Sequence, residues 1–212
     1  MPSRAKMRYM TEDEYLLAEE KATIRHEYVD GCVFAMSGAT DAHNIICGNI
    51  FAFLHGHVRA SGCRTYMNDM KVRIQSHKTY YYPDIMVSCE PFDAKSVFKN
   101  EPALLTEVLS PSTTQIDKRE KLVAYQKIAS LKEYVVVYQD RQKIEVYRRE
   151  SDGNWELLLF SPGEDLVLES LPNGHLRLPF ATIYEGYQPP HRVKEDESCY
   201  HTELQLFDYV DA

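Results

Sequence analysis

Two carboxylates inside apolar, strand-like segments are the residues of this chain most capable of chemistry. Asp84 lies in the segment Tyr80-Tyr-Tyr-Pro-Asp-Ile-Met-Val-Ser88, and Glu107 lies in Ala103-Leu-Leu-Thr-Glu-Val-Leu109. Each acid interrupts a short apolar or aromatic run, which is typical of a buried strand. A buried carboxylate is costly unless something pairs with it, and a divalent cation is a common partner. The pair therefore indicates a metal site where two strands end.

A lysine on the following helix would complete a site for phosphodiester hydrolysis. Asp84, Glu107 and the Val108 carbonyl would hold Mg²⁺ or Mn²⁺, which stabilises developing negative charge and activates water. Lys118 and Lys121 could each stabilise the transition state, because both border the apolar face of the helix early in its course. Spacing alone leaves the two lysines open. It also leaves open a plainer interpretation, in which the acids are solvated or ion-paired and the lysines lie in solvent.

The elements that must position these residues can be predicted along the chain. Thr11 and Glu14 form a capping box before a short helix, and Asp30-Gly31 turns a hairpin within residues 26–35. Strands are expected near 63–67, 70–75, 80–89, 103–109, 133–138, 143–149, 155–160 and 165–168; helices at 41–59, capped by Asp41, at 112–129, capped by Ser112, and for one turn in 178–184. This mixture predicts an α/β fold, a mixed β-sheet flanked by helices with an N-terminal helix and hairpin.

Length and composition describe an ordinary globular chain. Its 212 residues, 44% hydrophobic and 26% charged, fit one domain. Because there is neither a membrane-length apolar run nor the apolar core of a signal peptide, we expect a cytoplasmic protein with no membrane contact. The five cysteines are odd in number and lack zinc-site spacing, so we expect reduced thiols.

The charge is acidic and concentrated at the C-terminal end. The formal net charge is −8, and residues 193–212 contain six acids and one lysine. We therefore divide the chain into a domain of residues 1–192 and an acidic tail of residues 193–212. Acidic composition alone does not favour DNA, since lysine and arginine supply most non-specific affinity for phosphates.

Several motifs together resemble those of one family. They are Tyr82-Pro-Asp-Ile, Glu107-Val-Leu-Ser-Pro-Ser-Thr113, Asp117-x-x-x-Lys121-x-x-x-Tyr125, Leu131-Lys-Glu-Tyr-Val-Val-Val137, His26-Glu-Tyr-Val-Asp-Gly31 and Ala42-His43-Asn44. Over about residues 9–186 the chain resembles the Uma-two family, whose members are classed with restriction endonucleases. That family is similar to the PD-(D/E)XK nucleases, so the resemblance implies a restriction endonuclease-like core.

The resemblance also assigns roles to residues. It implies that Asp84 and Glu107 are the acids of the nuclease motif. The usual lysine two positions after the glutamate is replaced by Leu109. In this family the lysine lies on the next helix, which favours Lys121 over Lys118. Glu27 and His43 match family positions that could support the site, although a hydrogen-bonded histidine at a helix start and an ordinary glutamate are the plainer interpretations.

We therefore expect a Mg²⁺- or Mn²⁺-dependent endonuclease that hydrolyses phosphodiester bonds. DNA is the substrate that the resemblance implies, and a homodimer is expected where two strands must be cut. Two alternatives stay open. One is a catalytically inactive nuclease-like module for binding or assembly, which the acidic charge and the missing Glu-x-Lys favour. The other is a metal-dependent hydrolase of a small phosphorylated molecule, for which the sequence contains no specific motif.

Overall fold

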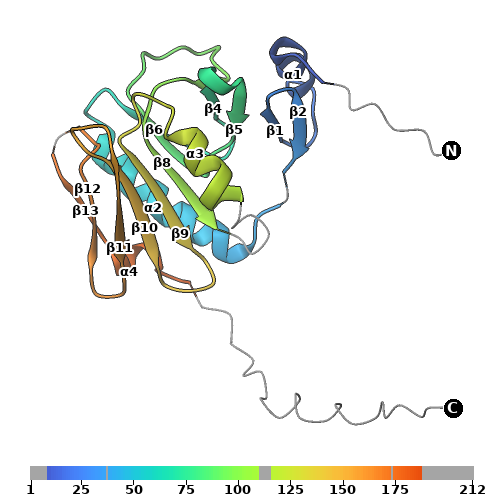
Figure 1. Ribbon diagram of the computed structural model, residues 1–212. Coiled ribbons are helices and arrows are strands. Elements are labelled where there is room, and N and C mark those ends of the chain that lie inside the picture. The colour runs from blue at the N-terminus through green and yellow to red at the C-terminus, as the bar shows by residue number, and fades with distance from the viewer. Residues whose placement is uncertain (1–8, 37, 110–115, 173, 188–212) are drawn as a thin grey trace, which may run out of the picture.

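The computed structural model describes residues 9–36, 38–109, 116–172 and 174–187 (Figure 1). Its helices are α1 (Glu12–Glu19), α2 (Asp41–Val58), α3 (Leu122–Tyr125) and α4 (Phe180–Ile183), with a 3₁₀ turn η1 (Gln75–His77) and a π-helical segment η2 (Ile116–Lys121). The strands are β1 (His26–Val29), β2 (Cys32–Ala35), β3 (Arg64–Met67), β4 (Lys71–Ile74), β5 (Thr79–Tyr81), β6 (Ile85–Ser88), β7 (Phe98–Lys99), β8 (Pro102–Leu109), β9 (Glu133–Tyr138), β10 (Ile144–Arg149), β11 (Trp155–Phe160), β12 (Asp165–Leu168) and β13 (Leu176–Pro179). No helix in these ranges is both long and apolar enough to span a bilayer.

Two mixed sheets form the body of the protein. The larger has the order β11-β10-β9-β8-β6-β3, in which β8 and β9 run parallel, and the smaller has the order β2-β1-β5-β4-β7. A separate antiparallel pair joins β12 to β13. This arrangement confirms the predicted mixed α/β class, although the strands divide among three sheets where the sequence indicated one.

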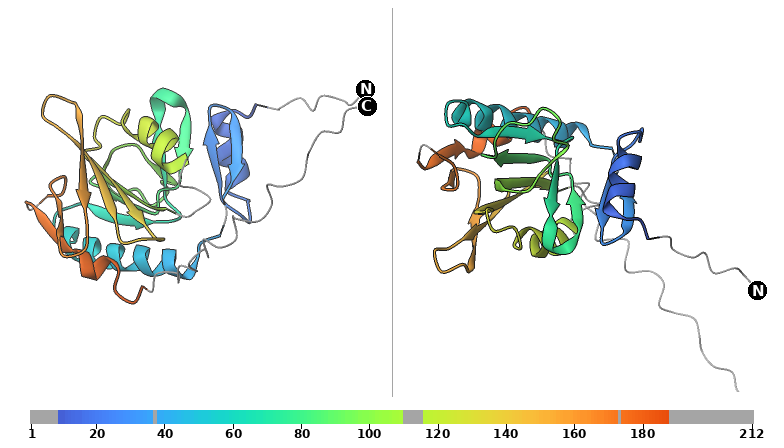
Figure 2. Two further views of the ribbon diagram at one scale, coloured as in Figure 1. Left: turned by 60° about the horizontal axis from the view of Figure 1, so that its bottom comes forward. Right: turned by 90° about the horizontal axis from the view of Figure 1, so that it is seen from above.

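The larger sheet is covered on both faces, and Figure 2 shows α2 and α3 on opposite sides of it. On one face, apolar residues of α2 and α4 pack against alternate positions of β8 such as Leu104 and Val108. On the other face, Leu105 and Leu109 pack against Tyr125 of α3 and against β4 and β5. Because β8 is buried on both faces, it reads in sequence as a nearly continuous apolar run.

Several local predictions are confirmed. The capping box of Thr11 and Glu14 starts α1, and the hairpin of β1 and β2 turns at Asp30 (φ 43°) and Gly31 (φ 92°), the left-handed pair that such turns require. The long helix is present as α2. Its cap is Thr40, whose side chain accepts the His43 N–H, so the assignment of Asp41 as the cap was wrong.

The predicted strand at 80–89 is two strands in different sheets. β5 ends at Tyr81 in the smaller sheet, and β6 begins at Ile85 in the larger one. Pro83 lies between them, and it has no N–H to offer a sheet ladder, so one continuous strand is disfavoured there. Asp84 therefore lies directly before β6, where the chain passes from one sheet to the other.

The helix expected at 112–129 also differs. In the described residues it begins as the π-helical segment η2 and continues as α3 only to Tyr125, while the predicted Ser112 cap lies outside the described residues. Short π-helical segments frequently occur at functional sites. The strands β7 and β13 were not predicted; β7 has two residues, too few for a pattern.

The expectation of reduced cysteines is wrong for one pair. Cys63 and Cys89 form a disulfide, whereas Cys32 and Cys47 are free and Cys199 lies outside the described residues. The pairing follows from the register of β3 and β6, in which Arg64 is opposite Ser88. One position further along, Cys63 is opposite Cys89, a neighbour relationship that only the sheet creates.

Candidate active site

Asp84 lies beside β8 and opposite Glu107. In the register of β6 and β8, Ile85 is opposite Thr106, so the preceding residue, Asp84, is opposite Glu107. The Val108 N–H donates to Asp84 Oδ2 at 2.7 Å, which fixes the carboxylate at the edge of β8. Two acids 23 residues apart in sequence thus become neighbours through antiparallel pairing.

Glu107 is nearly inaccessible and is held by the helix that follows it. The residue is 3% exposed, and its Oε1 accepts hydrogen bonds from Lys121 Nζ at 3.1 Å and Tyr125 OH at 2.8 Å. Lys121 and Tyr125 are four positions apart, so they lie on one helical face. The structure thereby brings Lys121 to Glu107, which is opposite Asp84 in the register; the side chain of Lys118 is outside the described part of the molecule.

Lys121 also connects the end of β8 to the smaller sheet. Its Nζ lies 2.9 Å from Oε1 of Glu27 on β1, and the backbone N–H of Tyr82 donates to the same oxygen at 3.4 Å. Glu27 was named from sequence only as a supporting residue. Its side chain is 14% exposed and directly contacts the candidate catalytic lysine.

His43 reaches the site from the first turn of α2. Its Nε2 lies 3.1 Å from Asp84 Oδ2, and its Nδ1 lies 3.5 Å from the Cys47 sulfur. The Thr40 cap fixes this turn of the helix. The plainer interpretation of His43 as a hydrogen-bonded histidine near a helix start therefore holds for its contact with Cys47. Its other ring nitrogen is within ion-pair distance of Asp84, the predicted metal ligand.

Burial and the acids determine the electrostatics of the surrounding groups. Burial, and then the charge of Glu107, raises the pKa of Tyr125 well above its usual value, so the phenol stays a hydrogen-bond donor at neutral pH. Burial, and then Glu27, raises the pKa of Tyr81 to about 12, while Lys121 opposes the rise. Burial also raises the pKa of the Cys47 thiol, with Asp84 and Glu107 both contributing. Asp84 and Glu107 therefore both lie close enough to Cys47 to affect the pKa of its thiol.

Sequence reasoning missed two members of this group. Tyr125 and Cys47 each lie four positions after a residue that was identified, namely Lys121 and His43. That spacing places each on the same helical face as its predecessor and was the available signal. An isolated tyrosine or cysteine on a helix is more often core, so spacing without the structure could not have assigned either one to the site.

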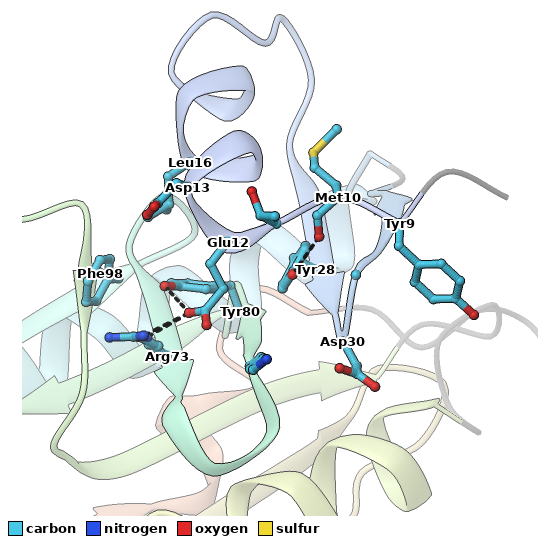
Figure 3. Close-up of a pocket in the computed structure, with 13 residues that line it drawn as sticks. Tyr9, Met10, Glu12, Asp13, Leu16, Tyr28, Asp30, Arg73, Tyr80 and Phe98 are labelled. Atoms are coloured by element: carbon cyan, nitrogen blue, oxygen red, sulfur yellow. Dashed lines mark hydrogen bonds and ion pairs between the residues drawn. The ribbon is translucent and has the colours of Figure 1, made fainter.

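A cavity lined in part by residues 9–13 does not include these residues. It has a volume of about 590 Å³ and lies between α1, the hairpin of β1 and β2, and β4 and β5. Figure 3 shows Glu12 within it, accepting from Arg73 (2.8 Å) and Tyr80 OH (2.9 Å). None of Glu27, His43, Asp84, Glu107 or Lys121 lines it. Its polar side chains join α1 to the smaller sheet, which indicates a structural role.

The fold of the protein is similar to that of a solved structure. It superimposes on the crystal structure of a putative nuclease belonging to DUF820 from Anabaena variabilis with a TM-score of 0.69 and 18% identity, covering 84% of this chain and 99% of that one. At this identity the likeness concerns the fold.

The sequence comparison is more specific. Residues 12–180 match the Uma2 family, described as "Putative restriction endonuclease", and the chain belongs to that family. Two relatives from Synechocystis sp. are the uncharacterized proteins slr1290 and sll1609. The first is 33% identical over 84% of this chain and 92% of its own length, and the second is 32% identical over 78% and 94%. The family resemblance inferred from sequence is thus confirmed.

Proposed function

We propose that the protein is a Mg²⁺- or Mn²⁺-dependent endonuclease that hydrolyses phosphodiester bonds of DNA. The observation that carries this proposal is the convergence of Asp84 and Glu107 on adjacent strands with Lys121 hydrogen-bonded to one of them. Two acids and a lysine at a sheet edge are the groups that metal-assisted phosphoryl chemistry requires. Membership of a family described as restriction endonucleases supports the same conclusion.

The donor set suits a hard divalent cation. Asp84 and Glu107 offer carboxylate oxygens, and Val108 directs its N–H toward Asp84, so its carbonyl faces the same strand edge. The carboxylates of Asp84, Glu107 and Glu27 with the Lys121 ammonium carry a formal charge of −2, which one divalent cation balances. When bound there, the ion would activate a water molecule and neutralise charge on the phosphate.

The protein groups around the acids have distinct proposed roles. Lys121 supplies a positive charge for the phosphate or positions the attacking water, and Glu27 holds its ammonium in place. Tyr125 fixes the orientation of Glu107 through its hydroxyl. The imidazole of His43 contacts the Asp84 carboxylate from α2 and helps to hold it in place. Each supporting contact comes from a different element, so the site depends on the assembled fold.

The proposal extends to the substrate, the assembly and the location of the protein. DNA follows from the family description, and a homodimer would supply two sites for the two strands of a duplex. We propose a cytoplasmic protein, in keeping with the absence, in the described residues, of a helix able to span a bilayer. The tail of residues 193–212 is proposed to be separate from the nuclease domain.

A cleavage assay on supercoiled and linear DNA with Mg²⁺ or Mn²⁺ tests the proposal. Asp84→Asn and Glu107→Gln should each abolish cleavage, as should chelation, because each removes a metal ligand or the metal. Asp69→Asn is the matched control: this acid is exposed and pairs with Arg25 at 3.0 Å, so the variant should cut like the parent. Equal cleavage by Asp84→Asn and the parent would refute the site.

One feature favours the inactive binding module as a second candidate. Lys121 already contacts both Glu27 and Glu107, so part of the acidic charge is balanced without a metal. Such a compensated network could serve only to hold the two sheets together. Purified protein that binds DNA and cuts neither DNA nor RNA with any divalent cation would establish this alternative.

A further inference from the structure

A group of side chains beside the proposed nuclease centre contains a thiol and an imidazole, which are not ligands that Mg²⁺ prefers. His43 Nε2 lies 3.1 Å from Asp84 Oδ2, and the Cys47 sulfur lies 3.5 Å from His43 Nδ1 and 4.0 Å from Nε2. One ligand atom from each of the three residues can be chosen so that all lie within 4.8 Å of one another. We propose that His43, Cys47 and Asp84 form a Zn²⁺ site that shares Asp84 with the nuclease centre, so that bound Zn²⁺ inhibits cleavage.

The separations suit a tetrahedral ion. With Zn–N and Zn–O distances near 2.1 Å and Zn–S near 2.3 Å, two ligand atoms of a tetrahedral site lie roughly 3.4–3.6 Å apart. One imidazole offers one nitrogen to the ion. With Nε2 as that nitrogen, its separations from Asp84 Oδ2 (3.1 Å) and from the Cys47 sulfur (4.0 Å) lie within about half an ångström of that range. Small movements of the three side chains would therefore bring the ligand atoms to tetrahedral separations.

The backbone already fixes the positions of the ligands. His43 and Cys47 are four residues apart on α2, so their side chains lie on one face of that helix. Cys47 is 1% exposed, and the Thr40 cap holds the turn that contains His43. Asp84 is fixed from the other side by the Val108 N–H. Such preorganisation reduces the conformational entropy that metal binding would cost.

The ligand types select the ion. Thiolate and imidazole suit Zn²⁺, whereas Mg²⁺ prefers oxygen ligands in octahedral geometry. The carboxylate of Asp84 brings a negative charge to the same three-residue cluster, which favours a cation there. A coordinated thiol releases its proton to solvent and binds as thiolate. Three protein ligands leave a fourth position for water or for Glu107.

Sharing Asp84 makes the two metals competitors. A Zn²⁺ ion bound to His43, Cys47 and Asp84 would withdraw from the nuclease centre one of the two carboxylates proposed to hold Mg²⁺. Inhibition rests on the proposed function, whereas Zn²⁺ binding does not. The two parts can therefore be tested by separate measurements on the same full-length protein.

The binding test uses Co²⁺ as a spectroscopic substitute for Zn²⁺, without reductant. A C32S/C199S background retains the Cys63–Cys89 disulfide and leaves Cys47 as its one free cysteine. We expect one equivalent of Co²⁺ to give tetrahedral visible bands and a near-ultraviolet thiolate-to-metal band, both removed by Zn²⁺. Adding C47S should abolish the thiolate band, and adding H43Q should weaken Co²⁺ binding by about 100-fold or more, beyond the usual loss from a supporting residue. Circular dichroism checks that both variants fold.

The inhibition test measures, for each variant, the cleavage rate with Mg²⁺ and added Zn²⁺ as a fraction of the rate of the same variant with Mg²⁺ alone. The parent and C32S should be inhibited by Zn²⁺, and C47S should need at least about tenfold more Zn²⁺ for the same loss. Absence of a thiolate band, or its persistence in folded C47S, would overturn the site whatever the nuclease activity. Equal inhibition of the parent and C47S would overturn the regulatory part. If no variant cuts DNA, the proposed function fails, and the spectra alone decide the Zn²⁺ site.

Discussion

Lys121 and Glu27 form an ion pair between two sheets of the protein, with 2.9 Å between Nζ and Oε1. Glu27 belongs to β1 of the smaller sheet, whereas Lys121 ends the π-helical segment that follows β8 of the larger one. Since Lys121 also donates to Glu107, two largely buried carboxylates share one ammonium. The candidate catalytic lysine is thus a structural bridge as well.

Removing this ammonium should damage both stability and activity. Lys121→Met leaves Glu27 and Glu107 without their shared cation, so we expect the free energy of unfolding to fall by about 3 kcal/mol or more. Cleavage should fall by about 10²–10³-fold, the effect of losing one transition-state contact. Urea denaturation and the cleavage rate measure the two effects.

A double variant separates the two roles. In Glu27→Gln/Lys121→Met one of the two uncompensated carboxylates is gone, so part of the lost stability should return. Cleavage should stay low because the ammonium is still missing. Lys118→Met is the matched control and should change activity much less. A Lys118→Met variant as inactive as Lys121→Met would refute the assignment of the lysine to position 121.

How far the site was predictable depends on which contacts are local in sequence. Asp84, Glu107 and Lys121 could be named because each lies in a distinctive motif. The bridge from Lys121 to Glu27 could not be predicted, because it joins the helical segment after β8 to β1 of the other sheet. The division of the two sheets at Pro83 gives no periodic signal in the sequence. Likewise, the Cys63–Cys89 pairing depends on the register of β3 and β6, which no spacing rule supplies. Local helices and hairpins were predictable; the assembly of sheets was not.

The buried lysine of β4 should make stability depend on pH. Lys71 is 6% exposed and donates to Tyr82 OH at 3.2 Å, and burial lowers its pKa, with Glu19 opposing the change. Between the folded and unfolded pKa values, the unfolded chain binds more protons than the folded one, so the free energy of unfolding rises with pH in that window. The protein should therefore gain stability from this group toward alkaline pH, up to the unfolded value of about 10.4.

A comparison with Lys71→Met isolates this contribution from that of other groups. The variant lacks the titrating group, so its stability relative to the parent should be highest near neutral pH and should decline as pH rises. Thermal denaturation at a series of pH values gives the difference, and Lys132→Met, at an exposed position, serves as the control. A difference that grows with pH would show that the sign is wrong.

Glu133 should be among the most important residues for stability. This carboxylate at the start of β9 is 0% exposed and accepts from Arg148 Nε at 2.8 Å and from the Ser170 N–H at 3.0 Å. Glu133→Ala leaves the Arg148 Nε–H and the Ser170 N–H without this acceptor, although Arg148 keeps its contacts with Glu169 and the Val167 carbonyl. We therefore expect a loss of about 3 kcal/mol, the effect of two unsatisfied buried donors. Glu156→Ala on the exposed side of β11 should change stability by no more than about 0.5 kcal/mol. Equal urea midpoints for the two variants would contradict this contrast.

The acidic tail, residues 193–212, lies outside the described residues. Its six acids and one lysine carry most of the net negative charge. If the tail repels phosphate, deleting it should strengthen binding of catalytically inactive Asp84→Asn protein to DNA at about 50 mM salt, and the gain should shrink as salt screens the charges. A full-length variant with the six acids changed to Asn or Gln should reproduce the gain, which separates charge from length. Fluorescence anisotropy across a salt series measures both. Unchanged affinity in the neutralised variant would reject the electrostatic role, and loss of folding or of a dimer on deletion alone would assign the tail a structural one.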